Sequence, residues 1–307
     1  MPAPLVIEVA VNGAVAKARN PNVPHTVDEL HASIGACVEA GASIVHVHAS
    51  APVVGGRTAH DASPYLELFG RVARSHPGVL LYPTLPGGGN GLDMRQRYAH
   101  IDQLRAAGLL RVAPIDPGSM NYGVKGEDGR PPAHEAVYVN TFADVDHAFA
   151  YCRAHGLACT MSVFEPGFLQ LVLAHQAAGS LPRASIVKFE FASGRRLFGL
   201  PPTPASLQAY LGMLRAAPLP WMVAVRDGDA AAALGREAIE LGGHVRVGIE
   251  DYGGGRAPRN EQLVAEVAAM ARRAGRVPAG AGEAARILGL PEPGQAAERR
   301  IANGGKP

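Results

Sequence analysis

The sequence is poor in cysteine and has almost no excess charge. Its three cysteines are scattered over 307 residues and form no Cys-x-x-Cys pair. An odd, scattered set argues against a disulfide framework and predicts a reducing, cytoplasmic location. The 29 Lys and Arg residues nearly balance the 27 Asp and Glu residues, which gives a formal net charge of +2. A large basic field for a nucleic-acid backbone is therefore excluded.

Long apolar runs are also missing. No stretch approaches the roughly 20 consecutive apolar residues that a transmembrane helix needs. The first residues lack the basic region of a secretory signal and lead directly into a strand-like run at Leu5. We therefore expect neither a membrane protein nor a secreted one. The chain does have ample material for a buried core, because 47% of its residues are hydrophobic and 18% are charged.

A repeated alternation of two kinds of segment runs along the chain. Short apolar runs rich in β-branched residues predict strands, and the longer Ala- and Leu-rich stretches between them predict helices. The eight predicted strands are Leu5–Asn12, Ser43–His48, Val79–Thr84, Leu109–Ile115, Ala158–Phe164, Ser185–Phe191, Trp221–Val225 and His244–Ile249. The predicted helices cover residues 27–40, 62–75, 93–107, 141–155, 166–178, 202–216, 229–241 and 258–274.

Strict alternation of strands and helices predicts a parallel sheet with helices packed against it. Eight units without an intervening linker predict an α/β protein with a closed (β/α)8 TIM barrel, in a single domain over residues 1–290. An open doubly wound sheet is the alternative. Residues 291–307 are polar and contain Pro and Gly, so we expect a loosely attached C-terminal tail. The longest insertion, residues 116–140, follows the fourth strand and so lies at the face where barrel active sites form.

Two histidines end the second predicted strand. His46 and His48 lie two residues apart in GASIVHVHAS, so their side chains share one face of the strand. In a barrel they would point inward at the carboxyl end of the strands. Imidazoles in this arrangement suit a divalent ion such as zinc. A pair of hydrogen-bonded core histidines is the alternative.

An acidic residue follows the last predicted strand. Glu250 in GGHVRVGIEDY shares its parity with Arg246, and Asp251 comes directly after it. In a closed barrel the second and eighth strands both flank the first, so Glu250 is able to join His46 and His48 as a third ligand. The alternative is a structural ion pair between Glu250 and Arg246.

Further polar side chains occur at strand ends and at inward-facing strand positions. A barrel buries such groups only where they are paired or used, so each is either structural or functional. They are Glu8, Asn12, Thr84, Ser119, Asn121, Glu165, Lys188, Glu190, Arg226 and Asp227. The glycine-rich run at residues 87–91 matches no nucleotide-binding pattern, but its backbone amides suit an anion or an active-site loop.

Several stretches resemble the beta-keto acid cleavage enzymes. They are AGASIVHVHA, LPGGGNG, DPGSMNYG, SVFEPG and HVRVGIED, followed by RNEQLVAEVAAMARRAGR and AGEAARILGL near the end. The resemblance covers roughly residues 4–290. It implies a zinc-dependent (β/α)8 barrel that forms a homo-oligomer, a tetramer or a dimer. The implied reaction condenses a β-keto acid with acetyl-CoA and cleaves the product into acetoacetate and a new acyl-CoA.

The resemblance also implies roles for individual residues. His46, His48 and Glu250 match the zinc ligands, although another divalent metal in place of zinc is an alternative. Asp251 with Arg246 matches the pair that forms the general base, and Glu165 lies at a matching acidic position, so these three are the expected catalytic residues. The residues expected to contact substrate are Glu8, Asn12, Thr84, Gly87, Gly88, Ser119 and Asn121.

Two stretches depart from the family pattern. Val15 stands where the family often has an acidic residue, and residues 252–256 replace an Asn and a hydrophobic run. These departures favour one alternative, a metabolite-binding barrel that has lost turnover. A metal-dependent aldolase or hydrolase on the same barrel would use the same three ligands. A non-haem iron oxygenase also uses two histidines and a carboxylate, but usually on an all-β fold.

Overall fold

The computed structural model describes residues 2–49, 59–89, 91–133, 137–215 and 217–291. All eight predicted strands are present within these ranges. They are β1 (Ile7–Ala10), β2 (Ile44–Val47), β3 (Leu80–Pro83), β4 (Val112–Ile115), β7 (Ala158–Val163), β8 (Ser185–Ala192), β9 (Trp221–Arg226) and β10 (His244–Val247). They form one parallel sheet in the order β3-β2-β1-β10-β9-β8-β7-β4. Because β3 and β4 also contact each other, the sheet curls into a nearly closed barrel.

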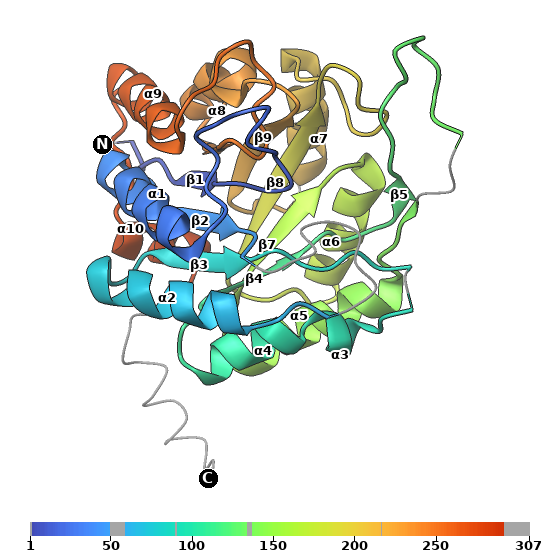
Figure 1. The fold of residues 1–307 in the computed structure, drawn as a ribbon. Coiled ribbons are helices and arrows are strands. Elements are labelled where there is room, and N and C mark those ends of the chain that lie inside the picture. Colours follow the sequence, from blue (N-terminus) through green and yellow to red (C-terminus); the bar gives the residue numbers. More distant parts are fainter. Residues whose placement is uncertain (1, 50–58, 90, 134–136, 216, 292–307) are drawn as a thin grey trace, which may run out of the picture.

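Helices surround this barrel (Figure 1). Their bounds are α1 (Val27–Ala40), α2 (Ser63–Ser75), α3 (Met94–Arg97), α4 (Ala99–Ala106), α5 (Phe142–His155), α6 (Pro166–Ala177), α7 (Pro204–Leu214), a π-helical turn (Ala231–Gly235), α8 (Arg236–Glu240), α9 (Asn260–Arg273) and α10 (Ala281–Leu288). The predicted TIM-barrel fold is therefore confirmed, and the doubly wound alternative is excluded. Among the described residues, no helix combines the length and apolar character needed to cross a bilayer.

Local sequence signals explain where the helices begin and break. Thr26 caps α1 by accepting a hydrogen bond from the Glu29 amide, and the Glu29 side chain caps in return. The predicted helix at residues 93–107 is divided at Tyr98 into α3 and α4. Arg97 and Tyr98, which lie at this break, are both buried.

The 116–140 insertion contains a short hairpin that the sequence did not predict. Strands β5 (Met120–Asn121) and β6 (Val137–Tyr138) pair antiparallel. The predicted C-terminal tail begins at Pro291, and its residues 292–307 lie outside the described residues. The single-domain organisation of residues 1–290 stays a prediction.

The barrel interior has two layers of different chemistry. At the amino ends of the strands, apolar side chains pack with helix α10, which covers this end of the barrel. We call this set the lower layer: Val6, Ile44, Leu80, Val112, Ala158, Ile186, Met222, Ala284, Ala285 and Leu288. One or two inward-facing positions further along the strands lie polar groups, all of them buried except Arg226, which is partly buried. We call these the upper layer: Glu8, His46, Tyr82, Lys188, Glu190, Arg226 and Arg246.

Candidate active site

The three predicted metal ligands lie together at the carboxyl end of the barrel. His46 is in β2, His48 follows its end, and Glu250 follows β10. Both β2 and β10 pair with β1, as the prediction of convergence required. The Nε2 atoms of His46 and His48 are 3.1 Å apart, and they lie 3.4 and 3.6 Å from Oε2 of Glu250.

These residues fit a divalent ion. Ligand atoms at 2.0–2.1 Å from a tetrahedral zinc are separated by about 3.3 Å, which is close to the spacing of the three atoms here. Oε2 of Glu250 is buried and has no hydrogen-bond partner among the described residues. Burial holds the pKa of His46 well below its ordinary value, so its imidazole is neutral and offers a lone pair. Burial raises the pKa of Glu250, but the charge of Arg246 and the nearby imidazole of His48 outweigh it and keep the carboxylate ionised.

Two glycines let Glu250 reach the histidines. Gly13 has a φ of 54°, and a Cβ there would lie 2.4 Å from Cγ of Glu250. Gly248 has a φ of 140°, and a Cβ there would lie 2.1 Å from the carbonyl oxygen of Ala10. Any larger residue at either position would displace the β10 loop from the end of β1.

Asn12 fixes the end of β2. Its side-chain amide donates to the carbonyl of His48 at 2.7 Å and accepts from the His48 amide at 3.0 Å. The predicted site residue Asn12 therefore contacts the end of β2 through the backbone of His48. This bond sets where His48 leaves the sheet.

Two arginines organise the acidic residues after β10. Nε of Arg246 donates to Oδ2 of Asp251 at 2.7 Å, so the predicted pair is in contact. Nη1 of Arg226 donates to Oδ1 of Asp251 at 2.6 Å and to Oε1 of Glu250 at 2.8 Å, and its Nε donates to Glu190 at 3.0 Å. Because the guanidinium groups engage Oε1 of Glu250, its other oxygen faces the imidazoles.

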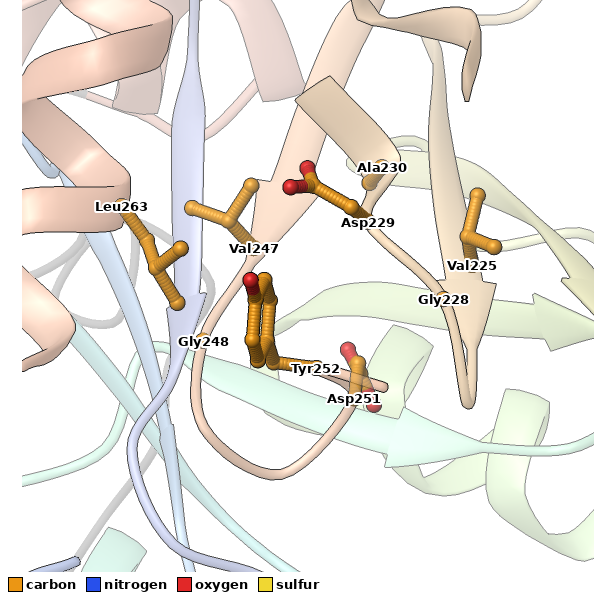
Figure 2. Close-up of a pocket in the computed structure, with 9 residues that line it drawn as sticks. All are labelled: Val225, Gly228, Asp229, Ala230, Val247, Gly248, Asp251, Tyr252 and Leu263. Atoms are coloured by element: carbon orange, nitrogen blue, oxygen red, sulfur yellow. The ribbon is translucent and has the colours of Figure 1, made fainter. Parts of the chain in front are cut away.

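The loop that carries Asp251 packs against the turn after β9 (Figure 2). Gly253 donates its amide to the carbonyl of Gly228 at 2.9 Å, and a Cβ at Gly253 would lie 2.2 Å from the carbonyl of Asp227. The glycine-rich departure at residues 252–256 thus allows a close contact between two loops. A cavity of about 10 Å³, room for about one water molecule, lies there beside Asp251 and Tyr252. The other departure, Val15, packs in an apolar cluster with Val23 and Ile249.

Glu8 lies inside the barrel, below its carboxyl end. It is fully buried, and its Oε1 is 2.6 Å from Nζ of Lys188 and 3.0 Å from Nη1 of Arg246. The hydroxyl of Tyr82 donates to the same oxygen at 2.6 Å. Burial raises the pKa of Glu8, but the two cations and these hydrogen bonds hold it below its ordinary value.

The predicted substrate residues near the hairpin make local bonds. The hydroxyl of Ser119 donates to the carbonyl of Asn140 at 3.0 Å and accepts from the Asn140 amide at 2.9 Å. Gly88 forms a β-bridge with Val139, and Gly87 packs near Tyr138. Asn121 is exposed in β5.

Two further predicted residues lie after the ends of other strands, at the carboxyl end of the barrel. Thr84 is buried at the end of β3, and its carbonyl accepts a hydrogen bond from His100 at 2.9 Å. Glu165 occupies the N-cap position of α6 without capping it, and its Oε1 instead accepts the amide of Gly199 at 3.0 Å.

Sequence reasoning gave no role to Tyr82 and none beyond a strand-end position to Arg226. The signal for Tyr82 was its parity, because it lies two residues before Thr84 on the inward face of β3. In the β2–β3 ladder it is the direct partner of His46. The signal for Arg226 was its place at the end of a strand beside β10.

Comparisons with known proteins match nearly the whole chain to one family. The family model described as BKACE, beta-keto acid cleavage enzyme, matches residues 4–290. The 3-keto-5-aminohexanoate cleavage enzyme of Fusobacterium nucleatum is 29% identical over 296 residues, which cover 93% of this chain and 98% of the relative. The 3-oxoadipate:acetyl-CoA acetyltransferase of Cupriavidus necator is 29% identical over 306 residues, covering 95% and 96% of the two chains.

Solved structures show the same fold at lower identity. The apo structure of ObcA has a TM-score of 0.68 and 18% identity, and the match covers 89% of this chain and 66% of ObcA. A dihydropteroate synthase from Yersinia pestis has a TM-score of 0.50 and 12% identity, with 89% of this chain and 95% of the synthase covered. Both similarities concern the barrel fold alone.

Proposed function

We propose, from the premise that the chain belongs to the beta-keto acid cleavage enzyme family, that it transfers an acyl group between a β-keto acid and acetyl-CoA. The products are acetoacetate and a new acyl-CoA. The observation that supports this most directly is the cluster of His46, His48 and Glu250 beside the Asp251–Arg246 pair. The two relatives described above are named for keto acids with different far ends, an amine and a second carboxylate. The proposal therefore commits to β-keto acids as a class.

The metal that we propose is zinc, held by His46, His48 and Glu250. When bound, a zinc ion supplies Lewis acidity to the ketone and a template for the acid's carboxylate. Arg226 and Arg246 keep Glu250 turned so that Oε2 faces the two imidazoles. Burial keeps His46 neutral, which leaves its lone pair available to the ion.

Asp251 is the proposed general base. Arg246 and Arg226 hold its carboxylate at 2.7 and 2.6 Å, and the side chain is almost fully buried. In the first half of the reaction Asp251 takes a proton from the carbon between the ketone and the carboxylate of the substrate. That carbon then attacks the thioester carbonyl of acetyl-CoA, so that a C–C bond forms and the C–S bond breaks, releasing the CoA thiolate.

In the second half Asp251 returns the proton. The CoA thiolate attacks the original ketone carbon, and the bond from that carbon to the former α-carbon breaks. The electron pair of this bond stays on the acetoacetate carbon, which takes the proton back from Asp251. The original acyl group leaves as acyl-CoA, so atoms and charge balance without a further reactant.

The test combines metal analysis with an acetoacetate assay. Wild-type protein is expected to carry one zinc per chain and to form acetoacetate from β-keto acids only when acetyl-CoA is present. His46→Ala is expected to lose both the zinc and the turnover, whereas His31→Ala on helix α1 keeps both. Full turnover by metal-free protein would refute the proposal. Turnover that does not need acetyl-CoA would favour the aldolase or hydrolase.

The remaining assignments stay predictions. They are zinc over another divalent metal, the tetrameric or dimeric state, the cytoplasmic location, the catalytic role of Glu165, and the substrate contacts of Glu8, Asn12, Thr84, Gly87, Gly88, Ser119 and Asn121.

A further inference from the structure

The imidazole of His46 is not oriented in the usual way. Metal-bound histidines usually donate their second ring N–H to a carboxylate, a carbonyl or a water, and this bond fixes the ring plane. In the described part of the chain, Nδ1 of His46 is buried and has no hydrogen-bond partner. The plane of this ring must therefore be fixed by packing.

Tyr82 supplies that packing. The rings of His46 and Tyr82 are stacked with centroids 4.7 Å apart and planes at 30°. His48 meets the His46 ring edge-on at 4.9 Å and 80°. Because His46 and Tyr82 are direct partners in the β2–β3 ladder, the backbone register itself places the two rings together.

The hydroxyl of Tyr82 is held from three other strands. It donates to Glu8 of β1 at 2.6 Å, and it accepts from Lys188 of β8 at 2.7 Å and from Arg246 of β10 at 3.2 Å. Only 1% of its surface is exposed, so packed neighbours enclose the ring. Three fixed partners at the hydroxyl and the close packing around the ring together hold the plane against which the His46 imidazole lies.

The same contacts join the two halves of the site. Arg246 touches the Tyr82 hydroxyl with one nitrogen and Asp251 with another. Tyr82 thus lies between the ligand His46 and the arginine that orients Asp251. A change at its hydroxyl reaches the base, and a change at its ring reaches the metal ligand.

We propose that Tyr82 is the positioning residue of the metal site. Its ring orients Nε2 of His46, and the hydrogen bonds at its hydroxyl hold the ring in place. This inference rests on the proposed function, because it requires an ion at His46, His48 and Glu250. Tyr82 does not touch substrate or ion in this assignment. Its effect is exerted through His46 and, at the hydroxyl, through Arg246.

The experiment separates the ring from the hydroxyl. Tyr82→Phe keeps the ring, and Tyr82→Leu and Tyr82→Met remove it, Met being the longer and more adaptable filler in case Leu destabilises the fold. Tyr210→Leu is the matched control, because Tyr210 is equally buried and stacks on Phe189 at the same centroid distance of 4.7 Å. The dissociation constant of metal-free protein for zinc is measured by competition with a coloured chelator, and cobalt-loaded protein gives an absorption spectrum that reports ligand geometry.

Loss of the ring is expected to weaken zinc binding about tenfold or more, the range for residues that orient metal ligands. The cobalt spectrum should shift in Tyr82→Leu and Tyr82→Met. Tyr82→Phe should bind zinc more tightly than these two variants and lose activity mainly in kcat, through Arg246 and Asp251. Tyr210→Leu should lower thermal stability and leave the zinc constant unchanged.

Zinc binding as tight as wild type in both Tyr82→Leu and Tyr82→Met would overturn the inference. So would an equal weakening in Tyr210→Leu, because the effect would then be a general loosening of the fold. A wild-type protein that binds no zinc would overturn the proposed function together with this inference. Wild-type binding that His46→Ala abolishes, with no effect of removing the Tyr82 ring, would overturn the inference alone.

Discussion

The lower and upper layers of the barrel interior use the same strand faces for opposite purposes. On β8, Ile186 packs in the lower layer against helix α10, whereas Lys188 and Glu190 belong to the upper layer. Val6, which directly precedes β1, and Glu8 within β1 show the same change. Within two residues the wall of the barrel passes from apolar packing to buried ion pairs.

This difference teaches which layer is scaffold and which is site. Lower-layer side chains stabilise the barrel by removing apolar surface from water. This effect depends little on which apolar residues are in contact. A buried ion pair is often no more stable than well-packed apolar residues of the same volume. We therefore infer that the charges of Glu8, Lys188 and Arg246 serve the groups above them and not the stability of the barrel.

Removing one upper-layer charge is expected to give the largest effect. Lys188→Met leaves the fully buried Glu8 with one cation fewer, and loss of one partner of a buried pair costs about 3–5 kcal/mol. The variant should also lose kcat, because Tyr82 loses a hydrogen bond. Urea unfolding at neutral pH and an assay at a temperature where the variant is folded measure the two effects.

The lower layer provides the control for this prediction. Ile186→Ala, two residues earlier on β8, should cost about 2–5 kcal/mol by leaving a cavity, yet keep kcat per folded molecule. The double variant Glu8→Gln with Lys188→Met should regain part of the stability lost by Lys188→Met. If Lys188→Met were as stable and active as wild type, the contrast between the layers would not hold.

Strand periodicity explains why so much of the candidate ligand set was predictable. His46 and His48 share a strand face, and Glu250 follows a strand that flanks β1, so their meeting depends only on period and barrel order. The pair of Arg246 and Asp251 is likewise local to one strand end. The eight strands were predictable for the same reason, because each one is a local apolar run in the sequence.

Residues whose position depends on contacts between distant strands were not predictable from the sequence. Tyr82 owes its place to strands β1, β8 and β10 as well as to its neighbour β2, and Arg226 owes its place to acids on β8 and after β10. No local pattern reports such a set of partners. The β5–β6 hairpin pairs residues on either side of a long loop, and its two-residue strands are too short for a period to be read.

A smaller effect is expected at the top of the upper layer. Arg226 bonds Glu250 and Asp251 through one nitrogen, so Arg226→Gln should lower kcat/KM about 10–100-fold, as for other residues that hold metal ligands. Arg246 still holds both acids, which limits the loss. Steady-state kinetics with acetyl-CoA and a β-keto acid at saturating zinc measure this change.

The paired variant keeps the result interpretable. Arg226→Gln leaves Glu190 buried without its partner, so Glu190→Gln with Arg226→Gln should recover stability but not kcat/KM. Arg226→Lys keeps the positive charge but loses the forked guanidinium. Its kcat/KM should fall between those of wild type and Arg226→Gln. Unchanged kcat/KM in Arg226→Gln would mean that Arg246 alone orients the acids.

The smallest effect belongs to a polar residue near the lower layer. Nδ1 of the buried His244 accepts the amide of Val6 at 3.0 Å, and burial lowers its pKa from 6.5 to about 3. The unfolded chain therefore binds a proton that the folded protein excludes, so stability is full above the unfolded pKa and falls as pH drops below it. Between pH 7 and about pH 5.5 this lowers the free energy of unfolding by about 1 kcal/mol.

His244→Gln keeps an acceptor for Val6 but cannot titrate. In urea unfolding it should therefore lose about 1 kcal/mol less stability than wild type over this pH range, with the same pH dependence above pH 7. An equal loss in both proteins would show that His244 takes up its proton without unfolding, and that even this end of the barrel admits a charge.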